Sequence, residues 1–182
     1  MGKSRANGGV ARSRTAASPV PMATYPAAPR SPAAAVIAGG LLVGALDGLY
    51  AVIASLIRGT DPSRVFMGVA SGLLGREAAF GGGATTVALG VLLHFTVATL
   101  IVLTYYLLSR PILVLRQHPI PSGALFGLVA YAVMNMVVIP LSAIDRSPLA
   151  FRPALAGAIV HVLLVGIPAA LVVRSAGNQR LA

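Results

Sequence analysis

Residues 84–108, ATTVALGVLLHFTVATLIVLTYYLL, decide the fold, because these 25 residues include no Asp, Glu, Lys or Arg. A helix of this length covers about 37 Å at 1.5 Å per residue, more than the ~30 Å hydrocarbon layer of a bilayer. Three further blocks, 34–57, 121–143 and 154–173, are similarly long and apolar. A backbone in lipid must satisfy its hydrogen bonds internally, so each block is predicted to be a helix. The sequence predicts an all-α integral membrane protein with a four-transmembrane-helix bundle.

The composition supports this interpretation. Of the 182 residues, 57% are hydrophobic and 10% are charged, whereas about a quarter of a soluble domain is charged. The formal net charge of +10 comes from basic residues spread between apolar blocks, so no specific nucleic-acid partner is expected. The absence of cysteine excludes disulfides, zinc fingers and c-type haem attachment.

The chain divides into three parts. Residues 1–32 are rich in Pro and Ala and carry five basic residues and no acid, so we expect a disordered tail that contacts anionic lipid headgroups. Residues 33–175 form the transmembrane domain and 176–182 a short C-terminus. With four spans, both termini and connection 109–120 share one side, which carries nine basic residues against five on the other. This excess predicts cytoplasmic termini.

The connection between the first two spans is predicted to contain a short helix, at about residues 62–75. Asp61 and Pro62 suit the cap and the first position of such a helix. The helix is too short to cross a bilayer, so we expect it to lie at the outer interface or to re-enter the membrane. The glycines at 81–83 are expected to end it and to turn the chain into the second span.

Each predicted span carries one strongly polar interior residue: Asp47, His94, Asn135 and His161. Counting from the non-cytoplasmic ends places all four about 10–15 Å below the outer boundary, within roughly one helical turn of each other. Small residues at three- and four-residue spacing favour close packing on the same faces: Gly40, Gly44, Gly48, Gly90, Gly123, Gly127 and Gly157. Together these positions predict one polar layer inside the bundle, with Tyr50 and Tyr131 beside it.

Four roles are open for this layer. It would hold the helices in register, with Asp47 protonated or paired with a histidine or Tyr50. It would pass protons or a cation through Asp47, His94 and His161. The same three side chains would bind a transition metal, or the two histidines would ligate a b-type haem. A protein without a cofactor is the leading expectation.

Two prolines, Pro140 and Pro168, lie within the third and fourth predicted spans. Proline has no N–H, and its ring crowds the carbonyl four residues earlier, so the carbonyls of Met136 and Leu164 are expected to lose their helical partners. Neighbouring helices usually accommodate such kinks, and we assign no function to them.

Signatures of an enzyme are missing from the sequence. The four acidic residues lie in separate segments, and there is no Gly-x-Ser-x-Gly, P-loop or dinucleotide-binding motif. We therefore expect a non-enzymatic scaffold or accessory subunit, which acts as a homo-oligomer or with a membrane partner. The alternative is a small oligomeric carrier or proton relay that uses the polar layer.

Eight segments of the transmembrane domain form a set: ALDGL (45–49), RV (64–65), ASGLLG (70–75), AFGG (79–82), LLHF (92–95), MN (134–135), PLS (140–142) and HVLLVGIP (161–168). As a set they resemble a family of small bacterial four-span membrane proteins without an assigned activity. The resemblance covers about residues 39–173 and leaves out the tail. It implies an inner-membrane protein with an extra outer-face helix between the first two spans, and it implies no substrate, cofactor or catalytic residue.

Overall fold

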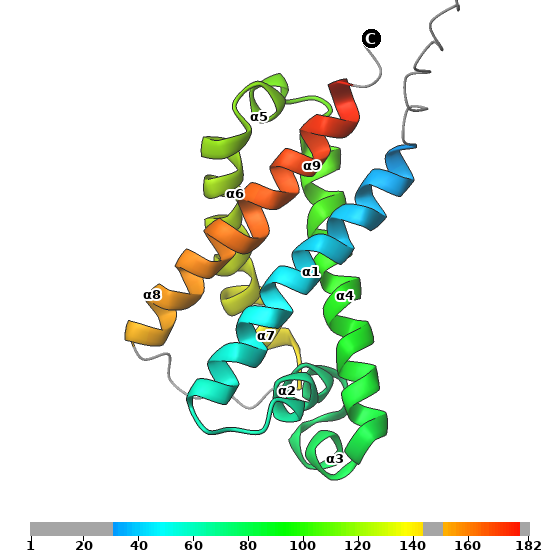
Figure 1. Ribbon diagram of the computed structural model, residues 1–182, viewed down its shortest axis with the longest axis vertical. Helices are drawn as coiled ribbons and strands as arrows, with labels where there is room; N and C mark the ends of the chain where they lie inside the picture. Colours follow the sequence, from blue (N-terminus) through cyan, green and yellow to red (C-terminus); the bar gives the residue numbers. More distant parts are fainter. Residues whose placement is uncertain (1–30, 144–150, 179–182) are drawn as a thin grey trace, which may run out of the picture.

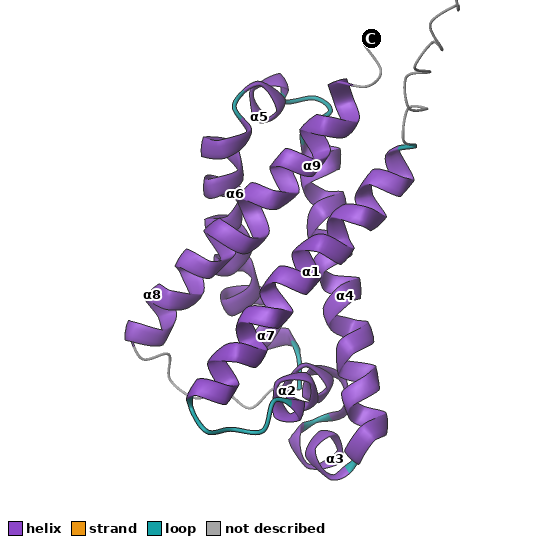
Figure 2. Cartoon of the chain, in the orientation of Figure 1, coloured by secondary structure: helices purple, strands orange, loops and turns teal. Residues whose placement is uncertain are grey.

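The computed structural model describes residues 31–143 and 151–178, and all regular secondary structure in these ranges is helical (Figure 2). The expected basic tail up to residue 30, the connection 144–150 and the last four residues lie outside the described residues. Four helices are long and apolar enough to cross a membrane: Pro32–Ile57, Gly83–Leu108, Pro119–Leu141 and Ala154–Ala176. The predicted all-α architecture with four spans is confirmed.

The first and second spans are single helices, α1 (Pro32–Ile57) and α4 (Gly83–Leu108). The third consists of α6 (Pro119–Val133), the π-helical segment η1 (Met134–Val138) and α7 (Ile139–Leu141). The fourth consists of α8 (Phe151–Val160), the π-helical segment η2 (His161–Gly166) and α9 (Ile167–Asn178).

The two π-helical segments include Met136 and Leu164, the residues whose carbonyls are expected to lose partners to Pro140 and Pro168. A proline ring crowds the carbonyl four residues before it. The wider π turn, with its i→i+5 hydrogen bonds, accommodates that crowding. The sequence therefore predicts where the third and fourth spans are disturbed, but not that the disturbance is a π turn.

Three shorter helices complete the fold: α2 (Ser63–Leu74), α3 (Arg76–Gly81) and α5 (Leu113–Gln117). α2 and α3 lie at one end of the bundle, and α5 lies at the other, beside the start of α1 and the end of α9 (Figure 1). We call these the α2–α3 end and the terminal end. The sequence predicts α2 but not α3 or α5, which are too short to show a helical period. α2 matches the predicted bounds of about 62–75 and ends at Gly75, whose φ of 77° suits glycine. The glycines at 81–83, expected to end this helix, lie instead at the end of α3 and the start of α4.

The start of α2 lies one residue later than predicted, because Pro62 and not Asp61 is its N-cap residue. The Asp61 carboxylate accepts a hydrogen bond from the backbone N–H of Ser63, at 2.9 Å, while Pro62 precedes the helix instead of beginning it. Hydrogen bonds from the Ser63 backbone and hydroxyl, and then the charge of Arg64, lower the pKa of the Asp61 carboxyl, and desolvation opposes them. A carboxyl whose pKa is lowered by folding stabilises the folded state at pH values above its unfolded-state pKa. This contribution is lost as the pH falls through the folded-state pKa.

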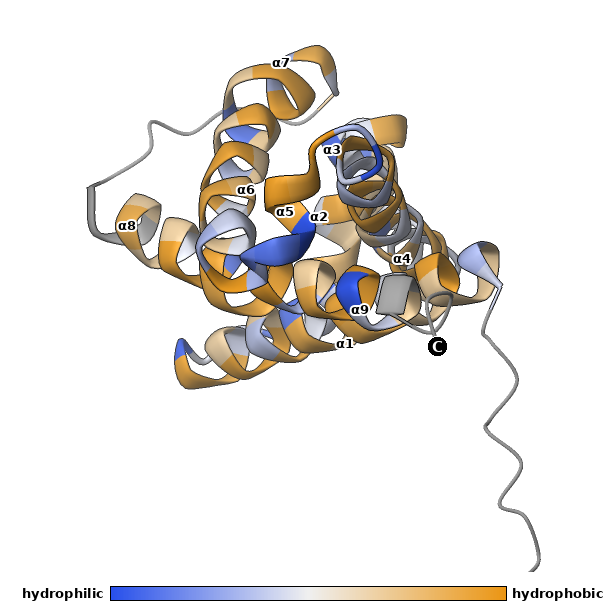
Figure 3. Ribbon diagram, turned by 90° about the horizontal axis from the view of Figure 1, so that it is seen from above, coloured by the Kyte–Doolittle hydropathy of each residue, from blue (hydrophilic) through white to orange (hydrophobic). Residues whose placement is uncertain are grey.

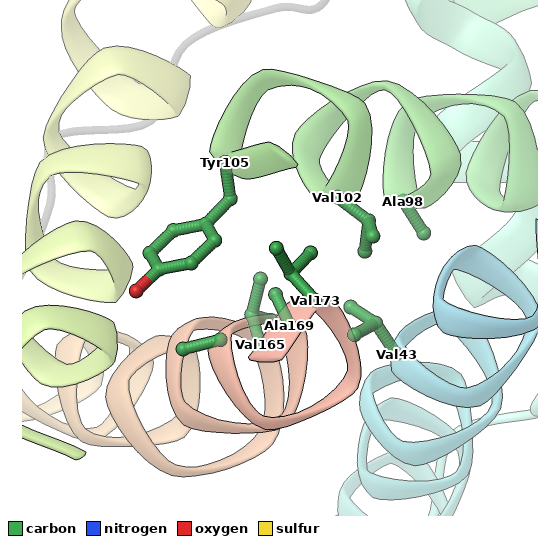
Figure 4. Close-up of a cluster of buried hydrophobic side chains, with 8 residues drawn as sticks. Val43, Ala98, Val102, Tyr105, Val165, Ala169 and Val173 are labelled. Carbon is green, nitrogen blue, oxygen red and sulfur yellow. The ribbon is translucent and has the colours of Figure 1, made fainter. Parts of the chain in front are cut away.

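The last span contacts each of the other three spans. α1 and α9 cross in front of α4 and α6 (Figure 1), and α9 packs against all three of these helices. The buried apolar cluster comes from α1, α4, η2 and α9 (Figure 4): Val43, Ala98, Val102, Tyr105, Val165, Ala169, Ala170 and Val173. The Tyr105 ring packs edge-on against Phe126 of α6, with centroids 5.0 Å apart. Its hydroxyl donates a hydrogen bond to the Leu115 carbonyl at 2.8 Å, which attaches α5 to the cluster.

All seven glycines predicted to mediate packing lie where helices touch. A Cβ on Gly44 would lie 2.6 Å from the Phe95 ring, and one on Gly40 would overlap Thr99, so α1 and α4 approach closely. A Cβ on Gly123 would lie 2.8 Å from the carbonyl oxygen of Gly166. Gly166 is a packing position that the sequence analysis does not identify, because a single glycine in η2 belongs to no stripe.

We predict that Gly90→Ala destabilises the protein, because its methyl group would overlap the Phe66 carbonyl where α2 packs on α4. Overpacking against backbone of this kind costs about 1–3 kcal/mol. Gly68→Ala is the matched control, because a Cβ on Gly68 meets no atom within 4 Å. Unfolding in detergent should give a lower midpoint for Gly90→Ala and an equal or higher one for Gly68→Ala. Equal losses in the two variants would contradict this packing.

Candidate functional site

His94 joins α4 to α1. Its Nε2 lies 2.8 Å from the carbonyl oxygen of Gly44, and since a carbonyl only accepts, Nε2 carries the proton and donates it. In the neutral ring the Nδ1 atom then keeps its lone pair. Phe66 and Phe95 pack edge-on against the imidazole, with centroids 6.1 and 5.5 Å away. A Cβ on Gly48 would lie 3.1 Å from Nε2, so this glycine leaves room for the ring.

His161 lies at a different helix contact. Its Nδ1 donates a hydrogen bond to the Gly157 carbonyl in its own helix, at 3.0 Å. The Tyr131 ring of α6 packs edge-on against it, with centroids 5.3 Å apart. Gly157 makes this contact possible, because a Cβ there would lie 2.8 Å from the Tyr131 ring.

Asn135 lies one turn after Tyr131, within η1. Its Nδ2 donates a hydrogen bond to the Tyr131 carbonyl at 2.9 Å. This bond stays within the third span, so Asn135 does not connect two helices through it. It satisfies the amide locally, as a polar group in a membrane interior requires.

Asp47 and Tyr50 do not form the pairs that the sequence analysis expects. Asp47 is half-buried, and no hydrogen bond or ion pair joins its side chain to another residue of the described ranges. Tyr50 is 39% exposed. The expected pairing of Asp47 with a histidine or with Tyr50 is therefore absent from the described part of the chain.

The structure divides the predicted polar layer into separate sites. His94 bonds to α1, whereas His161 packs against Tyr131 of the third span. Within the described residues, no three His, Cys, Asp or Glu side chains lie close enough to hold a metal ion. The set Asp47, His94 and His161 does not form a metal site there, and the two histidines contact different helices instead of facing a shared haem. Counting residues gives the height of a side chain, but not its direction around the helix axis.

The feature that sequence analysis missed is a groove between α4 and the third span. Its upper part is a cavity of about 460 Å³ with these lining residues: Val97, Leu100, Ile101, Thr104, Leu108, Phe126, Val129, Ala130, Val133, Met134 and Val138. Its lower part, of about 470 Å³, is closed by α2 and has these lining residues: Val65, Gly68, Val69, Gly72, Leu73, Leu93, His94, Val97, Met134, Val138, Ile139 and Ser142. The two parts share the lining residues Val97, Met134 and Val138, so they adjoin, and we call them together the α4–α6 groove.

Polar groups are few in this groove. The Thr104 hydroxyl donates to the Leu100 carbonyl of its own helix, at 2.8 Å, and the Ser142 hydroxyl donates to the Ile139 carbonyl, at 2.7 Å. His94 is the ionisable side chain among the residues that line the groove. Ligand pockets of about 300–1,000 Å³ are typically apolar with a few placed polar groups. The groove has this character, and the Nδ1 lone pair of His94 is a hydrogen-bond acceptor on a lining residue.

We predict that His94→Leu weakens the contact between α1 and α4, because it removes the hydrogen bond to the Gly44 carbonyl. Interhelical hydrogen bonds in membranes contribute about 0.5–2 kcal/mol, so the free energy of unfolding should fall by that amount. Thr96→Val is the control, because the exposed Thr96 hydroxyl bonds to Leu92 of its own helix. Denaturant titration in detergent measures both variants. A loss for Thr96→Val as large as for His94→Leu would show that the interhelical bond is not the cause.

Comparisons with protein-family models, with curated proteins and with solved structures find no match to this chain. The resemblance to small bacterial four-span proteins therefore stays a prediction.

Proposed function

We propose that this chain is a non-enzymatic, multi-pass protein of a bacterial inner membrane, with cytoplasmic termini, and that it binds a lipid-like molecule in the α4–α6 groove. The observation that carries the proposal is an apolar groove whose two parts adjoin and whose lining residues include a single ionisable residue, His94. An apolar chain would lie along the upper part, and the polar group of the molecule would lie near the imidazole.

The walls of the groove favour a flexible chain over a transmembrane helix. Helices pack closely in membranes where small residues line the contact. Here the α4 wall carries large residues such as Leu100, Ile101 and Leu108. The small residues Gly40, Gly44, Gly123 and Gly127 are already used inside the bundle. An acyl or prenyl chain is flexible and can follow a surface of branched side chains. The side chain of Met134, which also lines the groove, is flexible and can adjust to such a chain.

The polar group of the molecule is predicted to be a hydrogen-bond donor. Because Nε2 of His94 donates to the Gly44 carbonyl, the neutral ring offers Nδ1 as an acceptor. A hydroxyl or a protonated carboxylic acid supplies the matching donor. A permanently anionic group is disfavoured, because no Lys or Arg is among the residues that line the groove.

A proton or cation relay receives less support. Such a relay needs a chain of hydrogen-bonding groups, and in the described residues His94, Asn135 and His161 each bond to a backbone carbonyl. Asp47 bonds to none of these side chains within the same ranges.

Filling the groove tests the proposal. Val97→Trp places a large ring where the two parts of the groove meet. We expect the amount of lipid-like molecule that co-purifies in mild detergent, measured by mass spectrometry, to fall below half of the wild-type amount. Leu92→Trp is the matched control, because Leu92 is in the same helix, is 64% exposed and does not line the groove. Equal retention by both folded variants would overturn the proposal.

A second candidate function, that of an accessory subunit, is favoured by the exposure of the third span. In its most apolar window 6% of residues are buried, against 22–33% in the other three spans. Leu125, Leu128 and Met136 all lie on its exposed surface. A second copy of the chain or a partner subunit would cover this surface.

Because the chain has no cysteine, one introduced thiol reports on this surface. We predict that Leu125→Cys forms a disulfide-linked dimer in oxidised native membranes, while Leu92→Cys, on the exposed side of α4, does not. Non-reducing electrophoresis measures the dimer. Equal cross-linking at the two positions would indicate random collision and would contradict pairing through the third span.

A further inference from the structure

A small basic cavity lies at the terminal end of the bundle, apart from the α4–α6 groove. Its volume is about 200 Å³, and it is lined by residues from the start of α1, the end of α4, α5 and α9. Arg110 and Arg116 supply its charge, and Tyr106 and Ser109 are its other polar side chains. Since a water molecule takes up about 30 Å³ of the liquid, the cavity has space for a phosphate group with water.

The two guanidinium groups have no carboxylate partner in the described residues. No hydrogen bond or ion pair joins the side chain of Arg110 or Arg116 to another residue of these ranges. Of the four acids in the chain, Asp61 and Glu77 lie in the segment of α2 and α3, at the opposite end. Asp47 lies within α1 and Asp145 outside the described residues. Hydrophilic segments at α5 and at the end of α9 stand out against the apolar spans when the bundle is viewed from this end (Figure 3).

The fold fixes the position of Arg116. The hydroxyl of the fully buried Tyr105 donates to the carbonyl of Leu115, the residue directly before Arg116. Arg116 itself is half-buried, whereas Arg110 is exposed. The N–H of Arg110 bonds to the Leu107 carbonyl, which keeps the chain turned at the end of α4. Both arginines thus line the cavity from backbone that hydrogen bonds hold in place.

Helix dipoles at this end do not cancel the positive charge. The C-terminal ends of α4 and α9 each carry about half a negative charge, and the N-terminal end of α1, where Pro32 lines the cavity, carries about half a positive charge. Two complete guanidinium charges outweigh these partial charges. The cavity is therefore positive and selects an anion.

We infer that this cavity binds the phosphate of an anionic phospholipid headgroup. It lies where α1, α4 and α9 end, at Pro32, Leu108 and Asn178, which is the height of the headgroup layer if these helices cross a bilayer. Guanidinium groups bind phosphate with two parallel hydrogen bonds, and basic pockets between transmembrane helices are a known form of lipid site. The inference does not depend on what occupies the α4–α6 groove, because the two sites lie among different residues.

Lipid retention tests the inference. The complete protein is placed in vesicles of equal phosphatidylglycerol and phosphatidylcholine, extracted in mild detergent, and examined by native mass spectrometry. We expect wild-type protein to keep phosphatidylglycerol in preference to phosphatidylcholine. Arg110→Gln should lower the retained phosphatidylglycerol about tenfold, the usual effect of losing a charge-assisted hydrogen bond, and Arg110→Gln/Arg116→Gln should lower it further. Arg110 is exposed, so its single variant is expected to fold even if the double variant does not.

The control is Arg174→Gln, which removes the same charge from exposed α9 surface at the same end without touching the cavity. It should change retention by less than about twofold, because a diffuse charge makes no such hydrogen bonds. A loss equal to that of Arg110→Gln, or full retention by folded Arg110→Gln, would overturn the site. Inorganic phosphate added to lipid-free protein tests a soluble source. A thermal stabilisation by phosphate that Arg110→Gln abolishes would replace the lipid with a free phosphate ligand and overturn the lipid assignment.

Discussion

Close approach of helix backbones is the constraint on which this structure depends. Lipid tails are as apolar as the spans, so apolar burial does little to hold one span against another, and packing must do so. Gly40 and Gly44 bring α1 onto α4, and Gly123 and Gly127 bring α6 onto η2 around Gly166. Each glycine pair thus selects a partner for its helix. Because α4 and α6 are held to different partners, they remain apart and the groove lies between them.

Local hydrogen bonding explains why the polar residues do not gather in one centre. The side chains of Thr96, Thr99 and Thr104 each donate to the carbonyl four residues earlier. Asn135 and His161 use the same solution. A polar side chain that is satisfied by its own helix needs no partner across the bundle. His94 differs because Gly44 and Gly48 leave the α1 backbone open to its ring.

The sequence predicts the fold well and the candidate site poorly, for one physical reason. The length of an apolar block predicts a span. The glycines before the second span and the row of small residues around Gly44 can each be recognised within a single segment of the sequence. The groove depends on the rotation of α4 relative to α6, and Val97 and Leu100 look the same in sequence whether they face lipid or a cavity. The small helix α5 and the bond from Tyr105 to Leu115 join segments that show no periodic pattern. The basic cavity cannot be recognised in the sequence for the same reason. Arg110 and Arg116 contribute to the excess of basic residues that predicts membrane orientation, but the sequence does not show that both line one cavity.

The contacts of the last span with the other three spans have a consequence for biosynthesis. Half of the eight buried residues in the apolar cluster, Val165, Ala169, Ala170 and Val173, belong to the final part of the described chain. The ribosome makes this part after every other span, so α1, α4 and the third span enter the bilayer before their common partner exists. α1 and α4 contact each other directly through Gly40, Gly44 and the bond from His94, so they can pair first, and the last span then joins the third span to this pair. A chain that terminates early loses the element that joins the third span to α1 and α4.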